Sequence, residues 1–175
     1  SNKIGKAYRV EDAVGRYIEF SKQAVDNIDL RGMTVVLDCA NGAAYKTAPM
    51  ILKELGAKVI VLNKEPDGLN INDVCGAMYA DRMAPVVKEN RADVGIALDG
   101  DADRVIMLDE NGDVLNGDQL LLALALDMKK RGQLAKDTLV ATIMSNIGLE
   151  EACKKNDISL IRTQVGDRYV IEEMR

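Results

Sequence analysis

Histidine and tryptophan are absent from the 175 residues, and phenylalanine occurs once. Without histidine, the chain cannot by itself supply a Ser-His-Asp triad, a histidine-ligated zinc site or a histidine acid/base. Because large aromatic side chains are so few, the core must be built from Val, Ile, Leu, Met and Ala. These absences exclude several common enzyme classes before any motif is considered.

Cysteine is scarce as well, and Cys39, Cys75 and Cys153 show no CxxC spacing. An odd number of cysteines argues against a disulfide framework and favours a reducing, cytoplasmic location. No apolar run reaches the roughly 18 residues of a membrane span, and no signal peptide is visible. The net charge of −5 argues against non-specific nucleic-acid binding. Because the chain lacks an initiator Met, we expect it to be a piece of a longer protein.

Strand-like runs alternate with helical patterns along the chain, which is typical of layered α/β domains with a largely parallel sheet. Strands are expected at residues 33–40, 58–63, 93–99, 104–109, 138–144 and 158–163. Helices are expected at residues 10–25, 41–57, 79–92, 116–134, 145–157 and 166–175. A second unit is predicted to start near Asn116, which can cap its helix with Gln119 three residues on.

Three aspartates at alternate positions, Asp99, Asp101 and Asp103, separate two strand-like runs and precede Arg104. Carboxylates are hard oxygen ligands that suit Mg²⁺ or Ca²⁺. Alternate residues of a straight strand lie roughly 6.5–7 Å apart, so the chain must curl for all three to reach one ion. We expect Gly100 to adopt the required backbone angles. The three aspartates and the arginine carry a formal charge of −2, which one divalent cation would balance.

Two other interpretations of this acidic segment remain open. Ile106 and Glu110 fit the apolar and final acidic positions of an EF-hand calcium loop. However, Arg104 stands where the sharp turn needs Gly, and the flanking residues favour strands over helices. The other alternative is a turn of solvated carboxylates that binds no ion.

Seven segments together resemble a known family. The segment "ALDGDADR" resembles the metal loop of the α-D-phosphohexomutases, and the others resemble the phosphoglucosamine mutase branch. In chain order these are "GKAYRVEDAVGRYIEF", "VVLDCANGAAY", "DGLNINDVCGA", "NGDQLL", "MSNIGLE" and "VGDRYV". The resemblance implies layered helix–sheet–helix domains with mixed, largely parallel sheets. Residues 1–112 would form domain II with the metal loop and residues 113–175 the first part of domain III, without domains I and IV.

This resemblance also implies an activity for the longer protein. It would interconvert glucosamine 6-phosphate and glucosamine 1-phosphate through a phosphoserine and a bisphosphate intermediate, toward cell-wall precursors. By the resemblance, Asp99, Asp101 and Asp103 hold Mg²⁺ and Arg104 contacts the phosphoserine. The phosphoserine and the residues that choose the phosphosugar substrate lie elsewhere, so we expect this piece alone to be inactive. Phosphoglucomutase or phosphomannomutase activity therefore stays an alternative, and the oligomeric state is open.

A second candidate site lies in "VGDRYV". Asp167 is predicted to cap a helix, which places Arg168 near the positive helix end, where an anion would be favoured. The alternative is an exposed arginine in the first helical turn. In related phosphohexomutases this position is often a Lys proposed as general acid/base. Because Arg hardly deprotonates, we expect Arg168 to orient a substrate hydroxyl or phosphate instead.

The loop at residues 64–77 is long for a connection without secondary structure, and such loops are usually functional or disordered. We expect Asp67 and Asn70 to satisfy backbone groups of the loop. A further hypothesis places this loop at a domain interface. Asn41 and Gly42 are expected to form a strand-to-helix turn, and Asn146 is expected to cap the helix that follows it.

Overall fold

The computed structural model describes residues 5–6, 8–26 and 28–175, and it consists of two compact units that divide between Val114 and Leu115. Residues 1–4, 7 and 27 lie outside the described part, so the predicted domain of residues 1–112 is described only in part. Among the described residues, no helix has the length and apolar character needed to cross a bilayer. Each unit is described by itself.

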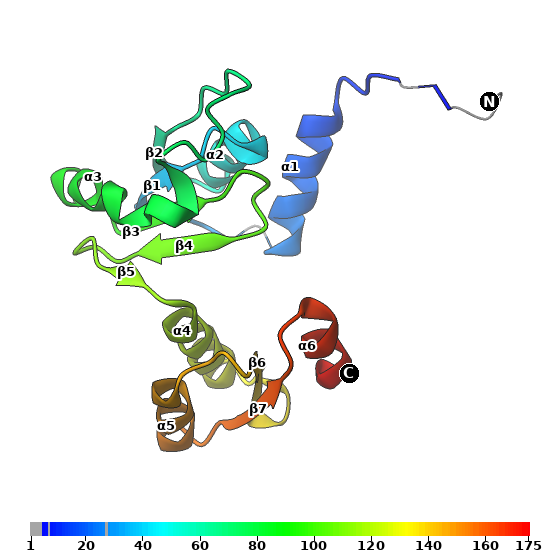
Figure 1. Cartoon of the computed structure of the whole chain (residues 1–175), viewed down its shortest axis with the longest axis vertical. Helices are drawn as coiled ribbons and strands as arrows, with labels where there is room; N and C mark the ends of the chain where they lie inside the picture. Colours follow the sequence, from blue (N-terminus) through cyan, green and yellow to red (C-terminus); the bar gives the residue numbers. More distant parts are fainter. Residues whose placement is uncertain (1–4, 7, 27) are drawn as a thin grey trace. The chain divides into compact units, whose positions relative to one another are not determined.

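The first unit is built on a five-stranded sheet in the order β2-β1-β3-β4-β5 (Figure 1). Its strands are β1 (Thr34–Asp38), β2 (Lys58–Leu62), β3 (Val94–Leu98), β4 (Val105–Leu108) and β5 (Val114–Leu115). β1 pairs in parallel with both β2 and β3, whereas β3 pairs antiparallel with β4. The carboxyl ends of the three parallel strands therefore lie along one edge of the sheet.

Helices cover this sheet because its inner strand β1 is apolar on both faces. They are α1 (Ala13–Ala24), η1 (Ala43–Tyr45), α2 (Thr47–Glu54), η2 (Gly76–Met83) and α3 (Ala84–Glu89). Val36 packs in a buried cluster with Met83 of η2 and Val87 of α3. Since side chains alternate along a strand, Val35 and Leu37 point to the other face, where they are buried too. α1 packs alongside α2 (Figure 1).

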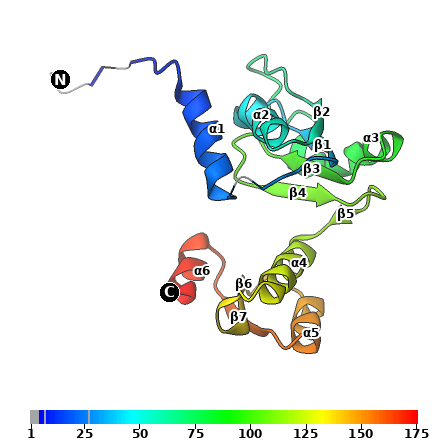
Figure 2. The same cartoon turned by 180° about the vertical axis from the view of Figure 1, so that it is seen from behind.

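The second unit contains a parallel pair of strands between helices. Its elements are α4 (Gly117–Lys130), η3 (Ala135–Asp137), β6 (Thr138–Thr142), α5 (Ile147–Lys155), β7 (Ser159–Thr163) and α6 (Asp167–Met174). α5 and α6 lie on opposite sides of the two strands (Figure 2). Ala125, Ala141, Leu149, Cys153 and Ile158 form the buried core. Asn116 and Gln119 make the predicted capping box, each side chain accepting from the other's backbone N–H.

The predicted layered α/β fold is confirmed, and each predicted strand contains one observed strand. Two predicted helices begin differently. The segment 41–57 starts as 3₁₀ turn η1, and α2 begins only at Thr47, because Ala40 and Asn41 take left-handed φ values of 52° and 48°. The segment 79–92 likewise starts as η2, and Pro85 lies in the first turn of α3.

Candidate functional site

The loop that joins β3 to β4 carries the three aspartates, and we call residues 99–104 the aspartate loop. It lies at the carboxyl edge of the sheet because β3 is a central parallel strand. The loop curls, with Ala102 N–H donating to the Asp99 carbonyl at 3.0 Å. Our expectation about Gly100 is wrong, because Ala102 takes the left-handed conformation, with φ 60°. A Cβ at Gly100 would lie 2.7 Å from side-chain atoms of Ile71 and Asn72, which would have to move to make room for it.

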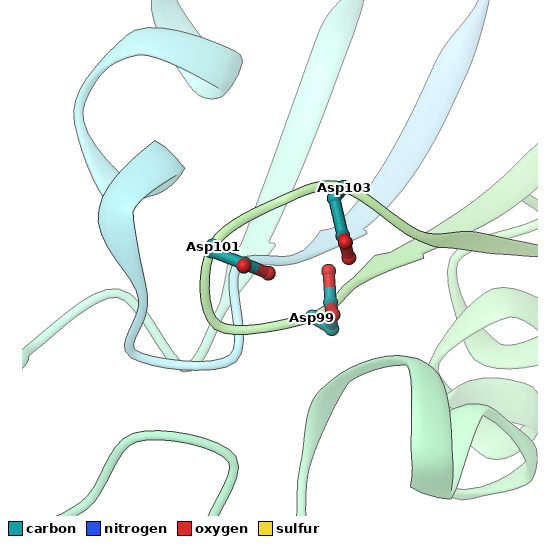
Figure 3. A group of neighbouring side chains, drawn as sticks. All are labelled: Asp99, Asp101 and Asp103. Carbon is teal, nitrogen blue, oxygen red and sulfur yellow. The ribbon is translucent and has the colours of Figure 1, made fainter. Parts of the chain in front are cut away.

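The curl brings the three carboxylates together. One oxygen from each of Asp99, Asp101 and Asp103 lies within 4.8 Å of the other two (Figure 3). Asp99 is only 2% exposed, whereas Asp101 and Asp103 are open to solvent. Mg²⁺ binds oxygen ligands at about 2.1 Å and usually keeps several water molecules. Three convergent carboxylates with an open side therefore fit a hard divalent cation after a small inward movement.

Arg104 is the counter-charge of this cluster. Its backbone N–H donates to Asp99 Oδ1 at 3.0 Å, and its Nε donates to Oδ2 at 2.8 Å. Nε also lies 3.4 Å from an Asp103 oxygen. Both oxygens of Asp99 are thus held, while the Arg104 side chain stays 64% exposed. The rest of its guanidinium is accessible to an anion such as phosphate, whose geometry it suits.

The pKa values of the two neighbouring carboxyls move apart. Burial raises the pKa of Asp99, but hydrogen bonds from the Arg104 backbone and side chain outweigh that effect and leave the pKa below its usual value. The hydrogen bond between Asp103 and Asp99, followed by burial and the charge of Asp101, raises the pKa of Asp103. The three carboxylates therefore repel one another, and a bound cation would reduce this repulsion.

Two segments distant in sequence hold the aspartate loop in place. Ala43 N–H donates to the Gly100 carbonyl at 2.7 Å. A Cβ at Gly42 would lie 2.3 Å from that carbonyl oxygen, and one at Gly76 would lie 2.5 Å from the Leu98 carbonyl oxygen. No local sequence pattern predicts this support. The available signal was that the segments after β1 and β3 must share one edge of the sheet.

The loop at residues 64–77 bears out the structural role expected for its polar side chains. Asp67 Oδ1 accepts from the N–H groups of Leu69 and Asn70, at 2.7 and 2.9 Å. Asn70 Oδ1 accepts from Asp67 N–H at 3.0 Å, and its Nδ2 donates to the Glu65 carbonyl at 2.9 Å. The expected turn at Asn41 and the Asn146 cap of α5 are also confirmed.

Arg168 lies in the second unit, in the first turn of α6. The N-cap of this helix is Gly166, with φ 136°, and Asp167 is already helical, so the prediction of an Asp167 cap is wrong. The Gly166 backbone takes a conformation that side chains rarely adopt, which moves the helix start back by one residue. Arg168 Nε donates to Glu172 Oε1 at 2.8 Å, and its side chain is 82% exposed. Its substrate-orienting role stays a prediction.

Comparison with known families agrees with this fold. Residues 15–112 match the family model "Phosphoglucomutase/phosphomannomutase, alpha/beta/alpha domain II", and residues 116–175 match the corresponding domain III. The mixed sheet of the first unit and the helices around it agree with the α/β/α class that both family models describe. The chain belongs to the phosphoglucomutase/phosphomannomutase family, which confirms the resemblance seen in its sequence motifs.

The curated relatives described here are phosphoglucosamine mutases. The chain is 54% identical to the phosphoglucosamine mutase of Geotalea uraniireducens over all of its length, covering 39% of that protein. It is 54% identical to that of Myxococcus xanthus, again over its whole length and 38% of the relative. With the phosphoglucosamine mutase of Geobacter metallireducens it shares 55% identity over 99% of the chain and 39% of the relative. The chain thus spans about two fifths of these homologues.

Solved structures agree in fold. A phosphoglucomutase/phosphomannomutase family protein from Burkholderia thailandensis superimposes with a TM-score of 0.78 at 21% identity, over 97% of this chain and 37% of that one. An N-acetylglucosamine-phosphate mutase superimposes with a TM-score of 0.66 at 20% identity, over 91% of this chain and 34% of that one.

Proposed function

We propose that this chain is the central part of a cytoplasmic phosphoglucosamine mutase, which interconverts glucosamine 6-phosphate and glucosamine 1-phosphate. The observation that carries the proposal is the convergence of three carboxylates in a chain 54% identical to phosphoglucosamine mutases. In this proposal, residues 1–112 are domain II and residues 113–175 begin domain III. The parts of the protein outside this chain supply domains I and IV, including the phosphoserine.

Asp99, Asp101 and Asp103 are the proposed ligands of Mg²⁺. Their hard oxygens and the exposure of two of them suit a cation that retains water and takes a phosphoryl oxygen. When bound, the cation supplies positive charge that neutralises a transferring phosphoryl group and holds it for in-line attack.

Arg104 has two roles in this proposal. Its two hydrogen bonds keep Asp99 ionised and correctly turned, so that the buried ligand is ready for a cation. Its exposed guanidinium faces solvent beside the aspartates, where it can bind oxygens of the phosphoserine.

Arg168 is proposed to orient a hydroxyl or phosphate of the sugar substrate. An arginine in the first turn of α6 adds its fixed charge to the positive end of the helix dipole. Its ion pair with Glu172 is exposed, and such pairs contribute little stability, so a phosphate can compete for the guanidinium at small cost.

The calcium-module alternative is disfavoured by the elements around the aspartate loop. An EF-hand places its loop between two helices, whereas β3 and β4 flank residues 99–104 here. The sister activities on glucose or mannose phosphate use the same fold and stay outcomes of the experiment.

The test uses the full-length gene product that contains this chain. Its turnover of glucosamine 6-phosphate with Mg²⁺ is compared with that of glucose and mannose phosphates, for the wild type, Asp101→Asn and the exposed control Asp157→Asn. We expect glucosamine turnover that falls by roughly a hundredfold in Asp101→Asn and is unchanged in Asp157→Asn. Turnover of glucose or mannose phosphate alone would reassign the substrate. Full activity of Asp101→Asn would refute the metal role.

A further inference from the structure

Asp38, at the end of β1, is one of two buried acidic residues of the described chain, the other being Asp99. It is 2% exposed, and its hydrogen-bond partners are neutral donors rather than a basic side chain. Oδ1 accepts from Ala40 N–H at 2.8 Å. Oδ2 accepts from Asn63 Nδ2 and from Gly76 N–H, both at 2.9 Å. Burying a carboxylate is costly unless such donors satisfy it. An apolar side chain would fill the same core position without that cost, so we look for a role of the carboxylate beyond packing.

The three donors belong to three different segments at the carboxyl edge of the sheet. Ala40 opens the turn between β1 and η1, Asn63 follows β2, and Gly76 begins η2. A further bond, from Asn41 N–H to the Asn63 carbonyl at 2.7 Å, joins the first two. Asp38 therefore fixes these segments relative to one another as well as to β1.

Two of these segments touch the backbone of β3 and the aspartate loop. The turn after Ala40 leads directly to Ala43, whose N–H donates to the Gly100 carbonyl at 2.7 Å. Gly76 lies so close to the Leu98 carbonyl that a Cβ would be 2.5 Å from its oxygen. Asp38 is thus joined to the backbone on either side of Asp99 through one intervening segment each.

We propose that Asp38 is a positioning residue that sets the conformation of the aspartate loop and thereby its affinity for a divalent cation. It acts through the Ala40–Ala43 turn and through Gly76, without contacting the cation. The inference rests on the proposed metal site. Residues that orient metal ligands indirectly typically change metal affinity by about 10–100-fold when they are replaced.

The experiment measures Mn²⁺ binding to the full-length protein by electron paramagnetic resonance, because Mn²⁺ favours the same oxygen ligands as Mg²⁺. Asp38→Asn preserves the size of the side chain but replaces one acceptor oxygen by a donor. We expect its Kd for Mn²⁺ to rise about tenfold or more, at a temperature where circular dichroism shows the variant to be folded.

Asp109→Asn is the matched control. Asp109 Oδ1 likewise accepts from two backbone N–H groups, those of Asn111 at 2.9 Å and Asp113 at 2.8 Å. It stands at the opposite end of β4 from the aspartate loop. We expect the control to lose stability without a change in Mn²⁺ affinity, which separates positioning from general destabilisation.

Asn63→Gly provides a milder second variant in case Asp38→Asn does not fold. It removes one donor to Asp38, and glycine tolerates the φ of 48° at this position. We expect about a threefold rise in Kd, smaller than for Asp38→Asn because the two backbone donors remain.

The possible outcomes separate the two proposals. Unchanged Mn²⁺ affinity in the folded variants, beside a wild type whose binding depends on Asp101, would overturn the positioning role alone. Absence of Mn²⁺ binding by the wild type would overturn the metal site and the positioning role together. Weaker binding by Asp38→Asn in a protein that does not turn over glucosamine phosphates would support the positioning role and refute the proposed substrate.

Discussion

At the scale of single residues, the site depends on a glycine that has no side chain as well as on the carboxylates. Gly42 and Gly100 meet backbone to backbone, so a Cβ at Gly42 would lie 2.3 Å from the Gly100 carbonyl oxygen. Gly42 has an ordinary extended conformation, with φ −104°, so only the space around it requires glycine. The carbonyl that a Cβ would meet belongs to the loop that carries the carboxylates.

Replacing Gly42 by Ala should therefore destabilise the first unit. We expect the free energy of unfolding to fall by about 1–3 kcal/mol, the usual cost of inserting a methyl group into a packed site. Urea denaturation of the 175-residue chain, followed by far-UV circular dichroism, measures the change.

Gly15→Ala is the matched control, because Gly15 lies inside α1 with nothing within 4 Å of the added Cβ. Alanine is the better helix former, so the control should gain about 0.5–1 kcal/mol. Equal effects of the two substitutions would contradict the close approach of Gly42 and Gly100.

At the scale of elements, the start of α4 is fixed by its cap. The Asn116 side chain accepts from Gln119 N–H at 2.9 Å, and Gln119 returns a bond to the Asn116 N–H at 2.8 Å. Asn116→Ala should lower the free energy of unfolding by about 1 kcal/mol, whereas Asn116→Ser should retain most of it because serine caps nearly as well. Urea denaturation compares the two variants, and an equal loss in both would refute the capping role.

Glu150 joins α5 to β7, and its charge makes that junction sensitive to pH. Hydrogen bonds from Lys154 and then Arg162 lower the pKa of Glu150 from 4.5 to about 2. A carboxyl with a depressed pKa stabilises the folded state above its unfolded pKa, and this stabilisation is lost as pH falls toward the folded pKa. The window here runs from pH 4.5 down to about 2.

We expect Glu150→Gln to lower the urea midpoint at neutral pH, and the difference from the wild type to shrink as the pH falls below 4.5. Glu151→Gln, at an exposed neighbouring position on the same helix, is the control and should show a smaller effect. Added salt should reduce the Glu150 effect, because the two ion pairs are partly exposed. A difference that does not depend on pH would argue against these pairs.

At the scale of the whole molecule, we expect the three thiols to be unreactive toward thiol reagents while the chain is folded. Cys39, Cys75 and Cys153 are buried and unbonded to one another. Burial raises the pKa of each thiol, that of Cys39 to about 11, so little thiolate exists near pH 8. A thiol reagent such as DTNB should titrate three groups in urea and almost none promptly in buffer. Fast reaction of one thiol in buffer would show that its segment opens.

Much of this architecture was predictable because it depends on local patterns. The alternation of apolar strands and amphipathic helices, the Asn116 capping box and the clustered aspartates can all be identified in short windows of sequence. The 3₁₀ starts at η1 and η2 could not, because they depend on left-handed residues such as Ala40 that no propensity favours. The three hydrogen bonds of Asp38, on which its proposed role rests, were equally hidden, since the donors come together only when β1, β2 and η2 are in place.

The antiparallel pairing of β3 with β4 has a consequence for the order in which the parts of the site form during folding. The two strands are joined by the aspartate loop itself, so this hairpin closes over a short span of chain, and such local events take microseconds. The contacts of Gly42 and Gly76 with the backbone around Asp99 need β1 beside β3, and this long-range pairing has a larger loop-closure entropy. We therefore expect the three carboxylates to be fixed in place only after β1 has paired with β3. A cation held by these carboxylates should slow unfolding while leaving the folding rate almost unchanged.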